Sequence, residues 1–206
     1  MKQYGEIVFT DKVKQAQEAH GSREAYAGMA ARPAPEGLSQ NEAAFISLRD
    51  SFYMATVSET GWPYVQHRGG PRGFLKVLSP TQLGFADYRG NRQYVSVGNL
   101  KTDNRVSLFL MDYPNRKRLK LLARSNVVSA NDNPDLATAL AIEGEGKVER
   151  LFTLDIEAFD WNCPQFITPR FTEEELTAAF APMVEELNWL RAENARLHKA
   201  LDQSST

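Results

Sequence analysis

The chain has 206 residues, a length that suits one well-cored domain with an appendage rather than two full domains. Its 24 Lys and Arg side chains nearly balance its 26 Asp and Glu side chains, so the formal net charge is -2. This balance gives no overall attraction for nucleic acid or an anionic membrane, and we expect neither as a partner. A single cysteine, Cys163, excludes an internal disulfide and any metal site built from several cysteines.

The sequence also predicts a compartment and the absence of a metal. Residues 1–6 lack the basic start and apolar run of a signal peptide, and no segment is apolar over the length of a membrane span. Together with the single cysteine, these features predict a cytoplasmic protein. No His or carboxylate cluster has metal-ligand spacing, so no metal site is predicted. Cys163 lies in an aromatic and proline-rich segment, and we expect its side chain to be packed.

Helical signals come first along the chain. A polar start and a following glycine predict a short helix at residues 10–20. After a proline-rich linker, Ser39 and Glu42 have the spacing of a capping box, which opens an amphipathic helix. We therefore assign residues 1–38 to a helical arm with a linker, and residues 39–170 to the main domain.

From Phe52 onward, apolar and polar residues alternate with the period of half-buried strands. Six or seven strands at this spacing predict a mainly β fold with helices, of the α+β class, built as a closed or nearly closed antiparallel barrel. A β-sandwich is the alternative. Two helices are expected to interrupt the barrel, at residues 91–99 and 134–141. The expected strands span residues 52–57, 64–68, 74–78, 83–88, 106–113, 119–128 and 148–156.

Two polar clusters mark the ends of expected strands. The first runs from Gln66 to Gly70, and the second runs from Gly90 to Gln93. Cationic and amide side chains beside glycines suit a phosphate or a ribityl chain, because glycine lets a ligand approach the backbone. A helix that starts at the second cluster would also present free N–H groups beside Arg92. The second cluster is therefore the stronger candidate for an anion site.

The chain ends in a segment with a heptad repeat. Thr172 and Glu175 have capping-box spacing, and Pro182 predicts that the helix proper starts near residue 181. The residues at the a and d positions of the heptad are Phe180, Met183, Leu187, Leu190, Asn194, Leu197 and Leu201.

This heptad pattern predicts self-association through residues 171–206. Asn194 is the one polar residue in the seam, and an Asn at an a position fixes register in parallel dimers. Glu186 at position g lies where Arg191 at position e of a partner helix could meet it. The alternative is an ordinary amphipathic helix that docks on its own barrel, because three heptads are short for a coiled coil.

The order and spacing of several motifs carry a family resemblance. The motifs are residues 52–57, 59–64, 83–85 and 104–108, together with residues 66–71, 90–94 and 111–115. In this order they resemble the FMN-binding split barrel of the pyridoxamine 5'-phosphate oxidase family, and the last three resemble an oxidase-related branch of it. The resemblance implies an antiparallel split β-barrel. It also implies a homodimer, because in this family the flavin lies in the groove between two barrels.

The resemblance further implies a set of FMN contacts. The family's phosphate-binding Ser-Arg-Lys falls on Asn91, Arg92 and Gln93, so the guanidinium is kept and one positive charge is missing. Arg118 falls roughly where the family places a flavin-contacting glutamine from the facing subunit. Four residues could supply the missing charge, namely Arg68, Lys76, Arg118 and Lys120. The cofactor-binding residues implied in this way are Gln66, His67, Arg68, Gly69, Asn91, Arg92, Gln93, Arg118, Lys120 and Gln165.

The function implied by the resemblance is that of an FMN-dependent oxidoreductase with a small-molecule substrate or a nicotinamide electron donor. Residues 161–165 end the barrel in place of the family's basic Arg-Leu motif, so vitamin B6 oxidation is not expected. His67 is the one catalytic candidate, and the sequence is equally consistent with a structural, hydrogen-bonded histidine at this position. The alternative function is a flavin- or haem-binding sensor or carrier without turnover, in which His67 would be the haem ligand.

Overall fold

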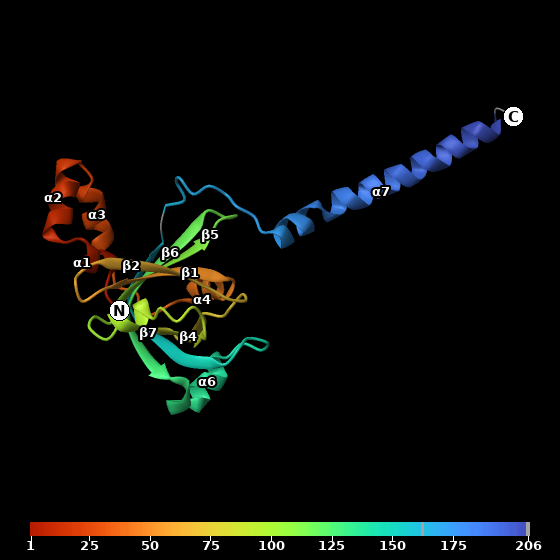
Figure 1. Cartoon of the computed structure of the whole chain (residues 1–206). Helices are drawn as coiled ribbons and strands as arrows, with labels where there is room; N and C mark the ends of the chain where they lie inside the picture. The colour runs from red at the N-terminus through yellow and green to blue at the C-terminus, as the bar shows by residue number, and fades with distance from the viewer. Residues whose placement is uncertain (162, 205–206) are drawn as a thin grey trace. The chain divides into compact units, whose positions relative to one another are not determined.

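The computed structural model describes residues 1–161 and 163–204. The chain forms two compact units, which are considered separately below. The first unit holds residues 1–112 and 116–166, and the second holds residues 113–115 and the chain from residue 167 onward. Figure 1 shows the helices and strands in chain order. None of the helices within the described residues is long and apolar enough to cross a bilayer.

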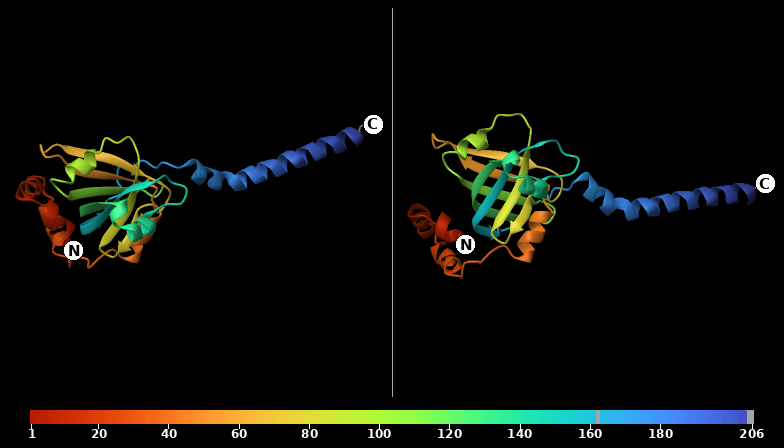
Figure 2. Two further views of the ribbon diagram at one scale, coloured as in Figure 1. Left: turned by 60° about the horizontal axis from the view of Figure 1, so that its bottom comes forward. Right: turned by 90° about the horizontal axis from the view of Figure 1, so that it is seen from below.

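The first unit is built on one antiparallel sheet of seven strands, in the order β2-β1-β5-β6-β7-β4-β3. The sheet curves around a common interior (Figure 2), and β2 and β3 form its two edges. The split barrel predicted from the sequence is therefore confirmed, and a single continuous sheet rules out the sandwich. The strands are β1 (Ser51–Val57), β2 (Pro63–Gly69), β3 (Lys76–Ser79), β4 (Gln82–Tyr88), β5 (Arg105–Asp112), β6 (Lys117–Ser129) and β7 (Val148–Trp161).

Short helices accompany this sheet. The predicted capping box is confirmed, because the Ser39 side chain accepts a hydrogen bond at the start of α4 and Glu42 accepts one from the Ser39 backbone. The arm at residues 1–38 contains three helices where the sequence predicted one. The helices of the first unit are α1 (Tyr4–Val8), α2 (Asp11–Ala19), α3 (Arg23–Ala30), α4 (Gln40–Ser47), α5 (Val95–Asn99) and α6 (Pro134–Leu140), with a 3-10 turn at Ala130–Asp132.

The barrel core contains an aromatic cluster contributed by three strands. The Phe85 ring is stacked on Phe152 at 4.7 Å between ring centroids, and it meets Phe52 edge-on at 5.5 Å. All three side chains are fully buried. Phe74 stacks on Phe52 from the segment before β3. Because buried aromatic pairs in van der Waals contact have little freedom to move, this cluster gives the interior of the barrel a fixed surface.

Gly84 in β4 packs against leucine side chains at a distance that leaves no room for a side chain. A Cβ atom at this position would lie 2.8 Å from Leu78 Cδ1 and 3.1 Å from Leu140 Cδ2. We expect Gly84→Ala to lower the free energy of unfolding by about 1–3 kcal/mol, the usual cost of overpacking. Urea unfolding followed by circular dichroism measures the change. Gly98→Ala in α5 is the matched control, because nothing lies within 4 Å of its added Cβ, and an equal loss in both variants would contradict the packing argument.

The second unit contains α7 (Glu173–Ser204). Its predicted capping box is confirmed, because the Thr172 N–H donates to Glu175 Oε2 at 2.9 Å and the Glu175 N–H donates to Thr172 Oγ1 at 3.2 Å. The predicted helix start near residue 181 is wrong, since the helix continues through Pro182. The position of this proline explains the difference. Pro182 is exposed, so water can pair the carbonyl group that loses its helical hydrogen bond.

Candidate functional site

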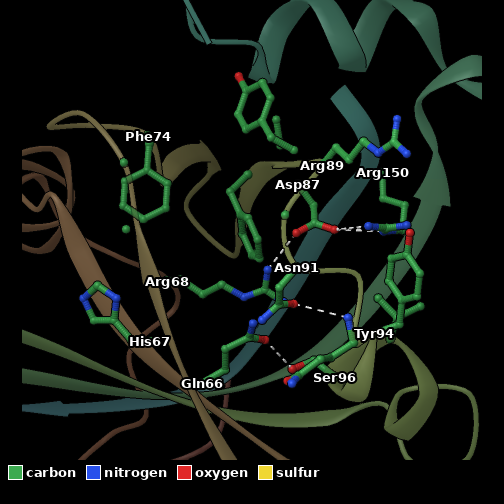
Figure 3. A pocket seen from close by; sticks show the side chains of 18 of the residues that line it. Gln66, His67, Arg68, Phe74, Asp87, Arg89, Asn91, Tyr94, Ser96 and Arg150 are labelled. Carbon is green, nitrogen blue, oxygen red and sulfur yellow. Dashed lines mark hydrogen bonds and ion pairs between the residues drawn. The ribbon is translucent and has the colours of Figure 1, made fainter. Parts of the chain in front are cut away.

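A cavity of about 410 Å³ lies between β2, the end of β4 and the segment that follows β4. Both polar clusters predicted from the sequence line this cavity (Figure 3), the first from β2 and the second from the segment after β4. Residues not assigned to the site by sequence reasoning also line it, among them Phe74, Asp87, Arg89 and Arg150. The predicted site residues in its wall are Gln66, His67, Arg68, Gly69, Asn91, Arg92 and Gln93.

Strand alternation determines which side chains of β2 enter the cavity. In the register with β1, Arg68 lies opposite the buried Phe52, and Gln66 lies opposite the buried Met54. Gln66 and Arg68 therefore lie on the interior face of the sheet. His67 borders the cavity, but its ring packs edge-on against Tyr53 at 5.5 Å on the other face. This position gives no support to His67 as an acid catalyst or a haem ligand.

The centre of the cavity wall is a chain of three charged groups. Asp87 accepts a hydrogen bond from Arg68 Nη1 at 2.7 Å through one oxygen and from Arg150 Nε at 2.8 Å through the other. The side chains of Arg68 and Asp87 are 13% and 12% exposed. Arg150 also pairs with Glu149, at 3.1 Å between Nη2 and Oε2, so the two guanidinium groups are balanced by two carboxylates. We refer to Arg68, Asp87 and Arg150 as the charge triad.

Arg68 is held in the triad by the aromatic core below it. Its guanidinium carbon lies 5.1 Å from the Phe152 ring centroid and 5.5 Å from that of Phe85, which are cation–π distances. Its Nε atom is buried and has no hydrogen-bond partner in the part of the chain that the structure describes. Arg68 thus packs on the aromatic core and pairs with Asp87 through Nη1, and its Nε–H group can still donate a hydrogen bond to a ligand.

The segment after β4 differs from the prediction. The sequence predicts a helix from residue 91, but α5 begins at Val95 and has five residues. Arg92 and Tyr94 have φ angles of 61° and 54°, the left-handed region that a helix cannot include. The Asn91 side chain accepts a hydrogen bond from the Gln93 N–H at 3.2 Å, which favours a turn over a helix. The predicted helix start at residue 91, which would have placed free N–H groups beside Arg92, is therefore wrong.

Arg92 and Tyr94 instead form the exposed edge of the cavity. Arg92 Nε donates to the Tyr94 hydroxyl group at 3.4 Å, and the Arg150 guanidinium carbon lies 4.6 Å from the Tyr94 ring centroid. The hydrogen bond from Arg92, followed by that from Arg150, lowers the pKa of Tyr94 below its ordinary value. The edge of the cavity thus presents cationic groups on both sides of one phenol.

Buried hydrogen bonds fix α5 against the sheet. Ser96 is 2% exposed, and its hydroxyl group donates to Gln66 Oε1 at 2.8 Å. Asn99 donates through Nδ2 to Thr56 Oγ1 at 2.9 Å. Because the Gln66 oxygen is engaged by Ser96, its amide NH₂ group is the part of this side chain left to meet a ligand acceptor.

Three predicted site residues lie outside the cavity wall. Arg118 packs over the Phe109 ring at 4.8 Å, and Lys120 pairs with Asp160 at 2.7 Å. Gln165 is exposed in the segment after β7. Lys76, considered as a replacement for the missing family lysine, donates to the carbonyl oxygen of Ala139. The extra positive charge of the cavity comes from Arg89 and Arg150 instead.

Sequence reasoning missed Asp87 and Arg150 because they are far apart along the chain. One local signal was present: Asp87 follows the buried Phe85 at a spacing of two, so it shares the interior face of β4. A carboxylate on an interior face needs a cation beside it.

Among the residues that the structure describes, no group of three or more His, Cys, Asp or Glu side chains is placed to hold a metal ion. Cys163 is exposed, so the expectation of a packed side chain is wrong. Proline and exposed polar residues follow Cys163, and this segment lies beyond the end of β7. The cavity wall presents arginine, amide, carboxylate and phenol groups.

Comparison with known proteins shows that the chain matches a protein family. The sequence pattern of the family described as Pyridoxamine 5'-phosphate oxidase matches residues 38–154. These residues include β1 to β4, α5 and all residues of the cavity wall. A search of curated proteins found no match.

The solved structures that the chain resembles share little sequence with it. A candidate pyridoxamine 5'-phosphate oxidase from Lactobacillus delbrueckii is 22% identical, with a TM-score of 0.48, over 61% of this chain and 95% of that protein. HupZ from Group A Streptococcus is 9% identical, with a TM-score of 0.48, over 65% and 99%. A FAD-binding protein from Mesorhizobium loti is 15% identical, with a TM-score of 0.41, over 61% and 95%.

Proposed function

Because the chain belongs to the pyridoxamine 5'-phosphate oxidase family, whose members bind flavins, we propose that it binds FMN in the cavity beside β2 and serves as an FMN-dependent oxidoreductase. One observation carries the proposal. The two polar clusters, which suit a phosphate and a ribityl chain, line the same cavity next to an aromatic surface. A flavin nucleotide needs these three kinds of contact together.

The residues of the cavity fit the parts of FMN. Arg89 and Arg92 are exposed at its edge and suit a phosphate group, which guanidinium groups can bind through two hydrogen bonds. The amide groups of Gln66 and Asn91 suit the ribityl hydroxyl groups. The partnerless Nε of Arg68 is a buried donor that a ligand acceptor would satisfy, and an unsatisfied buried donor otherwise costs stability.

The redox chemistry would come from the isoalloxazine ring, so no protein nucleophile is required. The protein's own residues bind and orient. The exposed guanidinium groups of Arg89 and Arg92 offset the phosphate charge. The hydrogen bond from Ser96 holds the Gln66 amide in one orientation before a ligand arrives, which lowers the entropy cost of binding.

The test is a titration of the purified chain with FMN, followed by flavin fluorescence and by the melting temperature. We expect saturable binding and a rise in melting temperature, because a ligand of the folded state stabilises by mass action. Arg92→Gln removes a charged hydrogen bond to the phosphate and should weaken binding by about tenfold or more. Arg116→Gln is the matched control, since Arg116 is exposed outside the cavity and shares the positive φ of Arg92. Equal binding by both variants would refute the assignment of Arg92.

A second measurement separates an enzyme from a carrier or sensor. The FMN-loaded chain is mixed with NADPH or NADH without oxygen, and the flavin absorbance is followed. Bleaching within seconds supports an oxidoreductase that accepts electrons from a nicotinamide. Tight binding without reduction by either donor would favour the carrier or sensor.

The three predicted flavin contacts that lie outside the cavity wall concern the number of chains in the assembly. Arg118, Lys120 and Gln165 lie apart from the cavity of their own chain, so they could contact its flavin only from a second copy. We therefore propose a homodimer.

A further inference from the structure

The heptad seam of α7 is exposed throughout its length. Its apolar residues from Phe180 to Leu201 are between 44% and 63% exposed. Because the helix continues through Pro182, Leu176 joins the seam as one more d residue, seven positions before Met183. Pro182 itself falls at position c, away from the seam. An apolar stripe of this length on a soluble helix indicates a surface that another helix covers.

The charges that flank the seam select an orientation. The g positions carry Glu186 and Glu193, and the e positions carry Arg191 and His198. In a parallel in-register pair each g residue meets the e residue five positions later on the partner, so both contacts join an acid to a base. In an antiparallel pair g meets g, which brings glutamates together. Glu193 also pairs with Arg196 of its own helix at 2.6 Å, so Glu186 and Arg191 discriminate most strongly.

We propose that α7 binds α7 of a second copy of this chain as a parallel, in-register, two-stranded coiled coil. The composition of the seam supports two strands in one register. Asn194 is the only polar a residue between Phe180 and Leu201, and two Asn194 side chains would meet in the same layer, which penalises shifted registers. Leu190 and Leu197 fill the d positions on either side of Asn194 with leucine, so the strand number is specified by the buried asparagine at the a position.

Disulfide cross-linking of the full chain tests the orientation. In a Cys163→Ser background, Leu197→Cys places one thiol in the seam near the C-terminal end. A parallel pair brings the two thiols into the same layer, within the Cα distance of about 5–7 Å that a disulfide requires. We expect a covalent dimer on mild oxidation. Ala192→Cys at position f, on the outer side of the helix, is the matched control and should stay largely monomeric on a non-reducing gel.

Charge exchange tests the recognition rule in the same background. Glu186→Lys with Glu193→Lys makes the flanking positions all basic and should slow cross-linking through residue 197 by about tenfold or more. Arg191→Glu with His198→Glu makes them all acidic and should have the same effect. A mixture of the two variants restores acid–base contacts and should cross-link as fast as the parent. Equal cross-linking at positions 192 and 197, or a dimer that persists without any cross-link at residue 197, would overturn the proposal.

Discussion

Replacement of Asp87 by asparagine is expected to lower the free energy of unfolding by about 3 kcal/mol. The variant keeps the shape of the side chain but leaves the guanidinium groups of Arg68 and Arg150 facing each other without a carboxylate between them. Removal of one partner from a buried ion pair typically costs about 3–5 kcal/mol, and the low end applies because the triad is slightly exposed.

Urea unfolding at low and high salt measures this loss. Asp103→Asn is the control, because Asp103 also pairs with an arginine, but its partner Arg105 has a side chain that is 71% exposed. An exposed pair contributes about 0–1 kcal/mol, and salt screens it. The loss from Asp87→Asn should persist in high salt, whereas that from Asp103→Asn should be small and should vanish. A small, salt-sensitive loss in both variants would show that the triad does not stabilise the fold.

The same variant separates stability from ligand binding. Asp87→Asn raises the net charge of the cavity wall by one. At temperatures where the variant is still folded, its affinity for phosphate should therefore not decrease. If FMN binds at this wall, the variant binds it at least as tightly as the parent while unfolding more easily. A loss of both properties would mean that Asp87 positions Arg68 and Arg150 for the ligand.

The strands and helix caps could be predicted because their signals are local. The prediction of a strand at residues 52–57 differs from β1 (Ser51–Val57) by one residue, since side chains that alternate across a sheet have a period of two. Ser39 and Glu42 are three residues apart and form their capping box through contacts within one turn. Such features need no knowledge of distant parts of the chain.

The features that could not be predicted depend on backbone geometry or on distant residues. Arg92 and Tyr94 adopt left-handed conformations, which are rare for residues other than glycine. No sequence pattern therefore predicts that α5 begins at Val95 and not at residue 91. Arg150 and Asp87 pair across 63 positions of sequence, through the β4–β7 register. The strands could therefore be predicted from the periodicity of the sequence, whereas the residues of the candidate site could be identified only once the pairing of the strands was known.

Replacement of Glu42 by alanine is expected to lower the free energy of unfolding by about 3 kcal/mol. Glu42 is 6% exposed, and its Oε1 accepts a hydrogen bond from Trp161 Nε1 at 2.7 Å. Its Oε2 accepts from the Ser39 N–H at 2.9 Å. The variant loses a hydrogen bond to a charged group, which typically contributes about 1.5–3 kcal/mol, and a helix cap, which contributes about 0.5–2 kcal/mol. Urea unfolding followed by tryptophan fluorescence measures the sum.

Glu42→Gln isolates the charge, because glutamine keeps the size and one acceptor oxygen. Burial raises the pKa of Glu42, but hydrogen bonds from Ser39 and Trp161 to the carboxylate outweigh it and lower the pKa below its ordinary value of 4.5. A carboxyl group whose pKa is lower in the folded chain stabilises above its unfolded pKa and loses that contribution as the pH falls through the folded pKa. The difference in stability between the parent and Glu42→Gln should therefore shrink below about pH 4.5. A difference that stays constant from pH 7 to pH 3 would show that the hydrogen bonds act through geometry and not through charge.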